Sequence, residues 1–302
     1  MIPTSELRRL ATRSGARQIR NVEIDIILTL LLQMFHERGL LEHLAFKGGT
    51  MLRKMVFGPR GRISTDLDFT LYSTIARDDI MMALLEAFGQ PYRGLRFQID
   101  QSNDWYLADE SCGANPLCAH DDNPIGIRIK LQVSLRERPI LPIVAMAQIP
   151  QEYFELLDFG PAAIPSIALE EVLAEKIRAA SQRSKIRDLH DLSESLNLEF
   201  YRPRVRGLAV LKLWSQHDSL NYAQLVKRIE EAADYDIADL TQLLRKDQRA
   251  DLAVLIKRVV EGYRFLNNLT ELESKLTDDK SRKAQTEADQ LVASLHQMSR
   301  PG

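Results

Sequence analysis

The hydrophobic period of this sequence changes near residue 160, and that change limits the folds the chain can adopt. Within residues 44–135, short segments alternate polar and apolar residues, which is typical of β-strands. From Ile167 onward, apolar residues recur every three or four positions, which is typical of amphipathic helices. The pattern predicts an α+β protein: N-terminal helices and a mixed-sheet domain over residues 1–160, then a mainly α-helical domain over residues 161–302.

Composition and charge exclude several classes of protein. The 40 Lys and Arg residues nearly balance 42 Asp and Glu residues, which excludes a highly basic, tail-driven binder of nucleic acid. Two cysteines are too few for a disulfide framework and fit a reducing compartment. The N-terminus lacks the apolar core of a secretion signal, and the longest apolar run, residues 24–34, is too short and too polar to span a bilayer. We therefore expect a soluble, cytoplasmic protein with no membrane partner.

The periodicity also predicts individual elements. Thr4 or Ser5 is expected to cap a first helix, and the clearest strand is expected at Ile125–Leu135, where polar and apolar residues alternate without a break. The other expected strands lie at 44–46, 64–71 and 95–99. The expected helices lie at 4–14, 18–38, 51–57, 77–88, 168–182, 187–196, 204–215, 221–233, 247–267 and 280–297.

Asp66 and Asp68 lie two positions apart in the expected strand 64–71, so both carboxylates project from one face. Adjacent carboxylates repel each other and are costly to bury unpaired. A divalent cation removes that repulsion, and Mg²⁺ typically takes one or two carboxylates together with phosphate oxygens of a substrate. Most such pairs are solvated surface charges, so the spacing indicates a metal site only together with a phosphate-binding element.

Gly48 and Gly49 stand between the expected strand 44–46 and the expected helix 51–57. At a helix start, free backbone N–H groups favour a phosphate, and the absence of a side chain lets the phosphate approach closely; Thr50 adds a hydroxyl donor. The segment is not a P-loop, because the further residues of that motif are absent. Gly-Gly followed by Asp-Leu-Asp is the layout of the nucleotidyltransferase superfamily, although 16 residues between Gly49 and Asp66 make a long spacing.

Four ordered segments resemble the AbiEii/AbiGii (MenT-like) nucleotidyltransferase toxins. They are Lys47–Thr50 with Arg62–Phe69, then Lys130–Glu137, Leu173–Ala179 and Arg183–Asp191. The resemblance covers about residues 40–195. It implies a nucleotidyltransferase-like mixed sheet, an NTP substrate, an RNA acceptor such as the 3′ end of tRNA, and a separate antitoxin protein as partner.

The resemblance also implies site residues. Asp66 and Asp68 hold Mg²⁺ or Mn²⁺, and Gln132 stands where the family usually has an acidic third ligand; its carbonyl oxygen carries no charge. The other implied catalytic residues are Lys176, Asp188 and Asp191. The implied nucleotide-binding residues are Lys47, Gly48, Gly49, Thr50, Arg53, Ser64, Lys130 and Arg187.

Residues 176–212 carry a local excess of positive charge, with nine Lys and Arg against four Asp and Glu. The excess is either a solvated helix surface or a basic surface that binds triphosphate or nucleic-acid backbone. In the second case Lys176 contacts nucleotide phosphates, and Asp188 and Asp191, at i, i+3 spacing, either orient the cations or act as a base.

The spacing of Cys112, Cys118 and His120 matches no standard zinc pattern, and a mobile loop near the rim of the active site is expected there instead. Two other functions stay open. One is a nucleotide-binding module without transfer activity, suggested by Gln132, and the other is a partner-binding protein in which the helical half carries the function. Transfer activity and its loss on replacing the aspartates would separate them.

Overall fold

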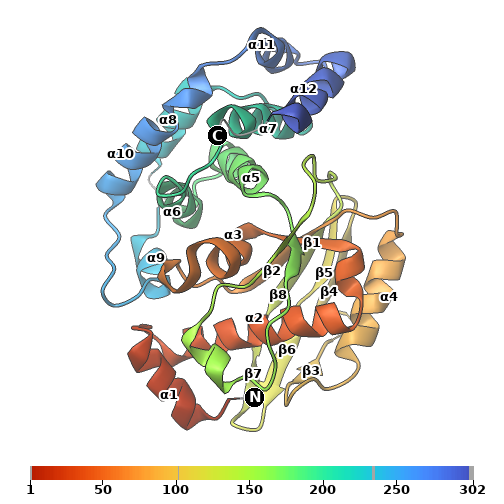
Figure 1. Ribbon diagram of the computed structural model, residues 1–302, viewed down its shortest axis with the longest axis vertical. Coiled ribbons are helices and arrows are strands. Elements are labelled where there is room, and N and C mark those ends of the chain that lie inside the picture. Colours follow the sequence, from red (N-terminus) through yellow and green to blue (C-terminus); the bar gives the residue numbers. More distant parts are fainter. Residues whose placement is uncertain (1, 101, 233–234, 299–302) are drawn as a thin grey trace. The chain divides into compact units, whose positions relative to one another are not determined.

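The computed structural model describes residues 2–100, 102–232 and 235–298, which form two compact units. The first unit contains the described residues of Met1–Pro139, Ile143–Ile167 and Thr241–Arg249. The second contains those of Ile140–Pro142, Ala168–Leu240 and Ala250–Gly302. Within the described residues, every strand lies in the first unit and the second unit is helical (Figure 1). The predicted α+β fold class is confirmed.

Two helices open the first unit, α1 (Thr4–Arg13) and α2 (Ile19–Glu37). Helix α2 is buried along almost its whole length, as its run of apolar residues predicts. The predicted capping of α1 by Thr4 or Ser5 is wrong, because Pro3 occupies the N-cap position without a side-chain hydrogen bond. The backbone N–H of Thr4 instead donates to Asp122 Oδ2 (2.8 Å).

Seven strands within the described residues form a mixed sheet in the order β4-β5-β8-β2-β1-β10-β9. Strand β2 is central, antiparallel to β1 and parallel to β8. The strands are β1 (Leu44–Lys47), β2 (Asp66–Leu71), β4 (Trp105–Ala108), β5 (Ser111–Ala114), β8 (Lys130–Ser134), β9 (Val144–Met146) and β10 (Ile164–Ser166).

A second sheet contains three strands within the described residues, β3 (Arg96–Gln98), β6 (Leu117–His120) and β7 (Asn123–Arg128). The prediction of one strand over Ile125–Leu135 is wrong, because β7 belongs to this sheet whereas β8 belongs to the larger one. The chain changes sheets at Ile129, whose N–H donates to the carbonyl of Pro116 (3.0 Å). Buried residues still alternate with more exposed ones through the break, so hydrophobic period alone does not reveal it.

The segment after β1 starts as helix α3 (Gly48–Met51) and continues as a π-helical segment, Leu52–Phe57. It packs near the start of β2 and therefore helps to position the candidate site. Helix α4 (Arg77–Phe88) matches its predicted range.

The second unit contains the helices predicted for the C-terminal half, with differences at their ends. The predicted helix 247–267 is shortened to α10, because Asp251 caps it by accepting a hydrogen bond from Val254 N (3.1 Å). Helices α9 and α11 were not predicted, and the last turn of α9 belongs to the segment Thr241–Arg249 of the first unit. The helices are α5 (Leu169–Gln182), α6 (Ile186–Ser195), α7 (Arg202–Trp214), α8 (Tyr222–Glu231), α9 (Ile237–Leu243), α10 (Leu252–Gly262), α11 (Glu271–Asp278) and α12 (Gln285–Gln297). None of the described helices combines the length and apolarity needed to cross a membrane.

Candidate functional site

Asp66 and Asp68 project from one face of the central strand β2. Both are partly exposed, whereas the alternating residues Leu67 and Phe69 are completely buried on the opposite face. Thr65 Oγ1 donates to Asp66 Oδ1 (3.3 Å). The alternation of the strand therefore gives the carboxylate geometry expected from the sequence.

The neighbouring strands place polar residues beside both aspartates. In the parallel pairing with β8, Lys130 lies beside Asp66 and Gln132 beside Asp68. In the antiparallel pairing with β1, Lys47 lies beside Asp68. Side chains at paired positions of adjacent strands share a face, so the sheet brings these three implied site residues next to the aspartate pair.

Gly48 lies against the carboxylate of Asp68. Its φ of +78° is in the left-handed region that favours glycine, and a Cβ built on Gly48 would overlap Asp68 Oδ2 and lie 3.0 Å from Asp68 Cβ. Backbone conformation and space therefore both require glycine here. The predicted proximity of the Gly-Gly turn to the aspartates is confirmed.

Two polar side chains of the loop before β2 lie against Gly49. A Cβ on Gly49 would be 2.6 Å from Arg62 Nη2 and 3.2 Å from Ser64 Oγ. Ile63, between them, donates its N–H to the carbonyl of Leu243 (2.9 Å), so the segment Thr241–Arg249 of the same unit helps to hold this loop. Arg62 was not among the residues implied to bind nucleotide. The sequence feature that could have identified it is its place in the segment Arg62–Phe69, which resembles the toxin family.

Thr50 does not offer its hydroxyl to the site. The side chain is completely buried, and the hydroxyl donates to the backbone carbonyl of Asp66. Thr50 therefore joins α3 to the start of β2 and fixes the distance between the Gly-Gly turn and the aspartates.

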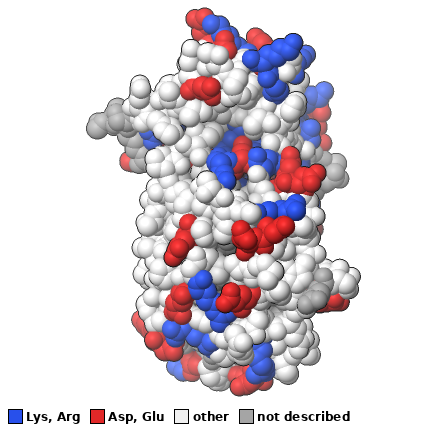
Figure 2. All heavy atoms as spheres, turned by 90° about the vertical axis from the view of Figure 1, so that its right-hand side faces the viewer, with Lys and Arg blue, Asp and Glu red and all other residues white. Residues whose placement is uncertain are grey.

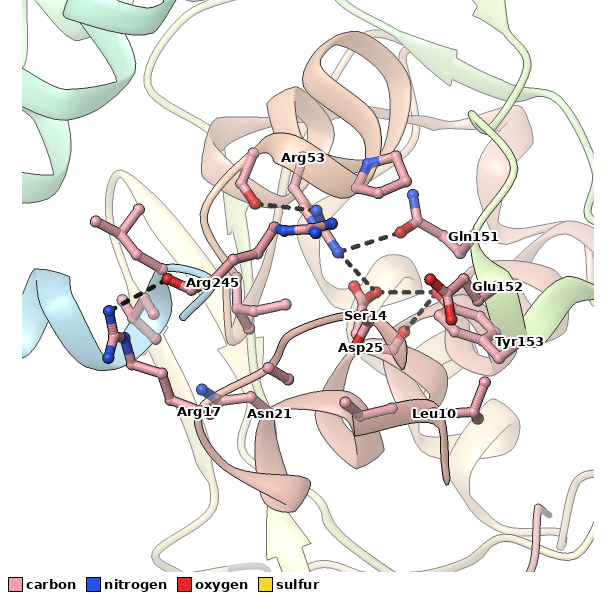
Figure 3. Close-up of a pocket in the computed structure, with 17 residues that line it drawn as sticks. Leu10, Ser14, Arg17, Asn21, Asp25, Arg53, Gln151, Glu152, Tyr153 and Arg245 are labelled. Atoms are coloured by element: carbon pink, nitrogen blue, oxygen red, sulfur yellow. Dashed lines mark hydrogen bonds and ion pairs between the residues drawn. The ribbon is translucent and has the colours of Figure 1, made fainter. Parts of the chain in front are cut away.

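Arg53 also differs from its predicted role, because its guanidinium points into the protein (Figure 3). Its Nη1 donates to the carbonyls of Gly58 and Gly61, and its Nη2 donates to Gln151 Oε1 (3.1 Å). The guanidinium thus fixes the turn that leads to Arg62 rather than reaching a phosphate. The predicted role is wrong because Arg53 makes a tertiary contact, and its partner Gln151 lies far along the chain.

Arg53 adjoins a buried ionic cluster around Asp25 (Figure 3). Lys54 Nζ donates to Asp25 Oδ1 (2.9 Å) and to Thr29 Oγ1 (2.8 Å), and Tyr153 donates its hydroxyl to Asp25 Oδ2 (3.1 Å). Burial acts to raise the pKa of Asp25, but Lys54 and Arg53 outweigh it, and the pKa is lowered. This cluster attaches the π-helical segment to α2.

In the second unit, Lys176 on α5 binds both aspartates of α6. Its Nζ lies 2.7 Å from Asp188 Oδ1 and 2.8 Å from Asp191 Oδ2, and Arg183 Nε lies 2.9 Å from Asp188 Oδ2. Burial acts to raise the pKa of Asp188, but Lys176 and Arg183 outweigh it and lower the pKa. A carboxylate stabilised in this way is a weak proton acceptor, so the arrangement favours a cation-orienting role over a base.

The cations of residues 176–212 do not form one exposed surface. Lys176 and Lys212 are buried, and Lys212 Nζ lies 2.9 Å from Glu171 Oε1. Arg187 makes a two-point contact with Asp239 on α9, at 2.7 and 2.6 Å. On the face shown in Figure 2, basic and acidic residues lie in small interspersed groups. Part of the charge excess is therefore used in ion pairs inside the second unit.

The predicted loop at Cys112, Cys118 and His120 is wrong, because these residues lie in paired strands of the first unit and are buried. Burial raises the pKa of the Cys112 thiol to about 11 and that of Cys118 to about 12. His120 Nε2 lies 2.9 Å from Glu23 Oε1. The described part of the chain holds no group of three or more His, Cys, Asp or Glu residues suited to a metal ion.

The donor set of β2 and β8 fits a hard divalent cation. Asp66 and Asp68 offer carboxylate oxygens and Gln132 offers an amide oxygen, which are the ligand types that Mg²⁺ and Mn²⁺ prefer. Because Gly48 has no Cβ, the Asp68 carboxylate can lie directly against the Gly-Gly turn. Magnesium typically uses one or two carboxylates and takes its other ligands from water and substrate phosphates, so this set is sufficient for it.

Comparison with known proteins identifies a family to which the sequence matches and a solved structure with a similar fold. The sequence profile of the family described as "Nucleotidyl transferase AbiEii toxin, Type IV TA system" matches residues 29–291. The fold is similar to that of MenT4, the nucleotidyltransferase toxin Rv2826c from Mycobacterium tuberculosis H37Rv, with a TM-score of 0.81 and 24% identity over 98% of this chain and 100% of that one.

More distant matches include JHP933 from Helicobacter pylori, with a TM-score of 0.44 and 19% identity over 86% of this chain and 95% of that one. No curated protein sequence is significantly similar to the chain.

Proposed function

We propose a function for this chain from its family, because it belongs to the AbiEii nucleotidyl transferase toxin family of type IV toxin–antitoxin systems. In this proposal the chain transfers a nucleotidyl group from an NTP to a hydroxyl of RNA. The proposal assigns the reaction to the face of the first unit that carries Asp66 and Asp68. The observation that carries it is the contact between Gly48, in its left-handed conformation, and the Asp68 carboxylate. This contact joins a phosphate-binding turn to a metal-binding pair.

Asp66 and Asp68 hold the divalent cation in this proposal, and the amide oxygen of Gln132 is a further, uncharged ligand. When bound, Mg²⁺ supplies Lewis-acid stabilisation of the charge that develops on the reacting phosphate. Because the two carboxylates share a face of one strand, cation binding also removes their mutual repulsion.

The chain's own groups bind and orient the triphosphate. In this proposal the backbone N–H groups of Gly48 and Gly49 and the guanidinium of Arg62, which is 5% exposed, bind the leaving pyrophosphate. The negative charge of the pyrophosphate grows as the bond to the α-phosphorus breaks. Ser64 supplies a hydroxyl donor on the same side. Lys47 and Lys130, beside the aspartates in register, add positive charge.

The RNA acceptor, and the tRNA 3′ end in particular, rest on the family resemblance of the four segments. A toxin–antitoxin family also implies a separate antitoxin protein. The contribution of the second-unit residues to nucleotide binding stays a prediction; they are Lys176, Arg187, Asp188 and Asp191. A second candidate, NTP binding without transfer, is favoured by one observation: the uncharged Gln132 beside Asp68.

The test is incubation of the purified protein with total RNA, Mg²⁺ and each labelled NTP in turn. We expect labelled RNA with at least one NTP, no labelling in EDTA, and none with Asp66→Asn. Asp78→Asn is the matched control, because this aspartate lies on α4 of the same unit with 78% of its side chain exposed, and it should retain wild-type labelling. NTP binding by calorimetry without any labelled acceptor would support the second candidate instead.

A further inference from the structure

Five residues lie side by side across the large sheet, in line with Asp68. Strand register pairs Lys47 with Asp68 and Asp68 with Gln132. It also pairs Gln132 with Gly113, and Gly113 with Tyr106 on the edge strand β4. We call this set the Asp68 row. Its members belong to five adjacent strands and share one face of the sheet.

The ring of Tyr106 covers Gly113. A Cβ on Gly113 would overlap the backbone carbonyl oxygen of Leu131 and lie 2.6 Å from Tyr106 Oη and 2.8 Å from Cζ, so this position has no space for a side chain. The Tyr106 hydroxyl donates to the carbonyl of Leu131 (3.2 Å) on β8. The ring therefore extends from the edge strand across β5 to the strand that carries Gln132, while the residue stays partly exposed.

The negative charge of Asp68 acts on the hydroxyl group of Tyr106. Burial raises the pKa of Tyr106, and the negative charge of Asp68 acts in the same direction. This agrees with the strand register, which separates Tyr106 from Asp68 only by Gly113, which has no side chain, and by Gln132.

The two ends of the row have different roles in an in-line displacement. The attacking oxygen and the leaving group lie on opposite sides of the reacting phosphorus. The Gly48–Gly49 turn adjoins the Lys47 end of the row, on the β1 side of Asp68. If the leaving pyrophosphate occupies that side, the acceptor hydroxyl approaches from the β8 side, where Gln132 and Tyr106 lie.

We propose, resting on the proposed function, that Tyr106 is a specificity-determining residue that stacks on the terminal base of the RNA acceptor. A base at the end of a single strand is unpaired, and proteins commonly bind such bases by stacking them on aromatic rings. The hydrogen bond to Leu131 fixes the orientation of the ring, and Gly113 leaves the space in which the ring lies.

The test compares Tyr106→Ala, Tyr106→Phe and the control Leu107→Ala in transfer assays. Leu107 is the next residue of β4, points to the opposite face and is 52% exposed. We expect Tyr106→Ala to raise the acceptor KM about tenfold to a hundredfold, the range given by loss of one base–aromatic stack, with the NTP KM unchanged. Tyr106→Phe keeps the ring and should recover most of the affinity for the acceptor, and Leu107→Ala should behave as wild type.

Three results would overturn the inference: an unchanged acceptor KM in Tyr106→Ala, an equal rise of the NTP KM, or a Tyr106→Phe variant as weak as the alanine variant. A wild-type protein without transfer activity would instead overturn the proposed function. Binding of fluorescent single-stranded RNA to the NTP-loaded protein, followed by anisotropy, would then still test Tyr106: unaltered binding in Tyr106→Ala contradicts stacking, and weakened binding supports it.

Discussion

Two aspartate pairs, one in each unit, have opposite surroundings. Asp66 and Asp68 are two apart on a strand and partly exposed on the sheet face. Asp188 and Asp191 are three apart on α6, almost completely buried, and both lie within 2.8 Å of Lys176 Nζ. In each pair the spacing matches the period of its element, so spacing alone does not distinguish the pairs.

Their burial and the role proposed for each pair do distinguish them. The chain itself supplies Lys176 to the buried pair, so this charge balance is part of the folded state. In the proposed function the pair on β2, which has the oxygen donors that suit Mg²⁺, binds a cation that enters from solution with a nucleotide. A pair with a built-in cation stabilises a fold, whereas a pair that recruits its cation can bind and release a substrate.

The largest effect is expected from Asp68→Asn, which removes one carboxylate with little change in volume. Loss of a metal ligand removes several kcal/mol of transition-state stabilisation, so transfer should fall at least about a thousandfold. The free energy of unfolding should change by less than about 1 kcal/mol, because the residue is partly exposed. Initial rates of labelled-NTP incorporation and urea denaturation of the same preparation measure both quantities. Activity above a tenth of wild type would place the metal elsewhere.

The next largest effect is expected from Lys176→Met, which removes the cation of the buried pair. Asp188 and Asp191 then stay buried without the lysine that lies between them, so unfolding free energy should fall by about 3 kcal/mol. The control is Lys227→Met, since this lysine is 69% exposed and pairs with Glu231 on the surface of α8; it should change stability by about 0.5 kcal/mol or less. Urea midpoints for both variants give the comparison, and equal midpoints would show that Lys176 does not balance the pair.

A smaller effect is expected from acid. The pKa of Asp188 is lowered in the folded protein from an ordinary value of 3.8. Its ionised form therefore stabilises the fold above pH 4, and this contribution is lost as the pH falls below 4 through the folded pKa. Stability should be flat from pH 7 to 5 and then decrease, and part of the decrease is assignable to this group. In Asp188→Asn the acid loss should be shallower, leaving the share of Asp25, whose pKa is also lowered. Identical acid profiles for the two proteins would contradict this assignment.

Local periodicity was enough to predict the carboxylate geometry and the Gly48 turn. Alternation along a strand depends only on the strand itself, and the left-handed conformation of Gly48 is a local property. The engagement of Arg53 depends on Gln151, 98 residues away, so it could not be inferred from local sequence.

Strand register and the assignment of strands to sheets could also not be predicted from the sequence. The position of Tyr106 in the same row as Gln132, with Gly113 between them, depends on how β4, β5 and β8 align. The break between β7 and β8 depends on the hydrogen bond from Ile129 to Pro116. Both are pairings between separate segments, which hydrophobic period does not specify.

The smallest effect, and the sharpest test of the comparison, is expected from Gln132→Glu. The new carboxylate would stand beside Asp68 in register, so the metal-free protein should lose up to about 1 kcal/mol through like-charge repulsion. The same charge strengthens cation binding, so the Mg²⁺ concentration for half-maximal transfer should fall about threefold to tenfold, corresponding to ~0.6–1.4 kcal/mol. Thermal melts with and without Mg²⁺ and a Mg²⁺ titration of transfer provide the two readouts.

The control for that variant is Gln98→Glu, which adds the same charge at an exposed position of β3 and should move neither readout. In Gln132→Glu we expect lower stability without metal and tighter metal binding. These opposite shifts would show that the side chain at this position binds a cation taken up from solution. A stability loss that Mg²⁺ does not recover would mean that the side chain at position 132 is repelled by the charge of Asp68 but does not bind the metal. In that case β2 alone would carry the metal-binding pair, and the Asp68 row would contribute to substrate contact rather than to cation binding.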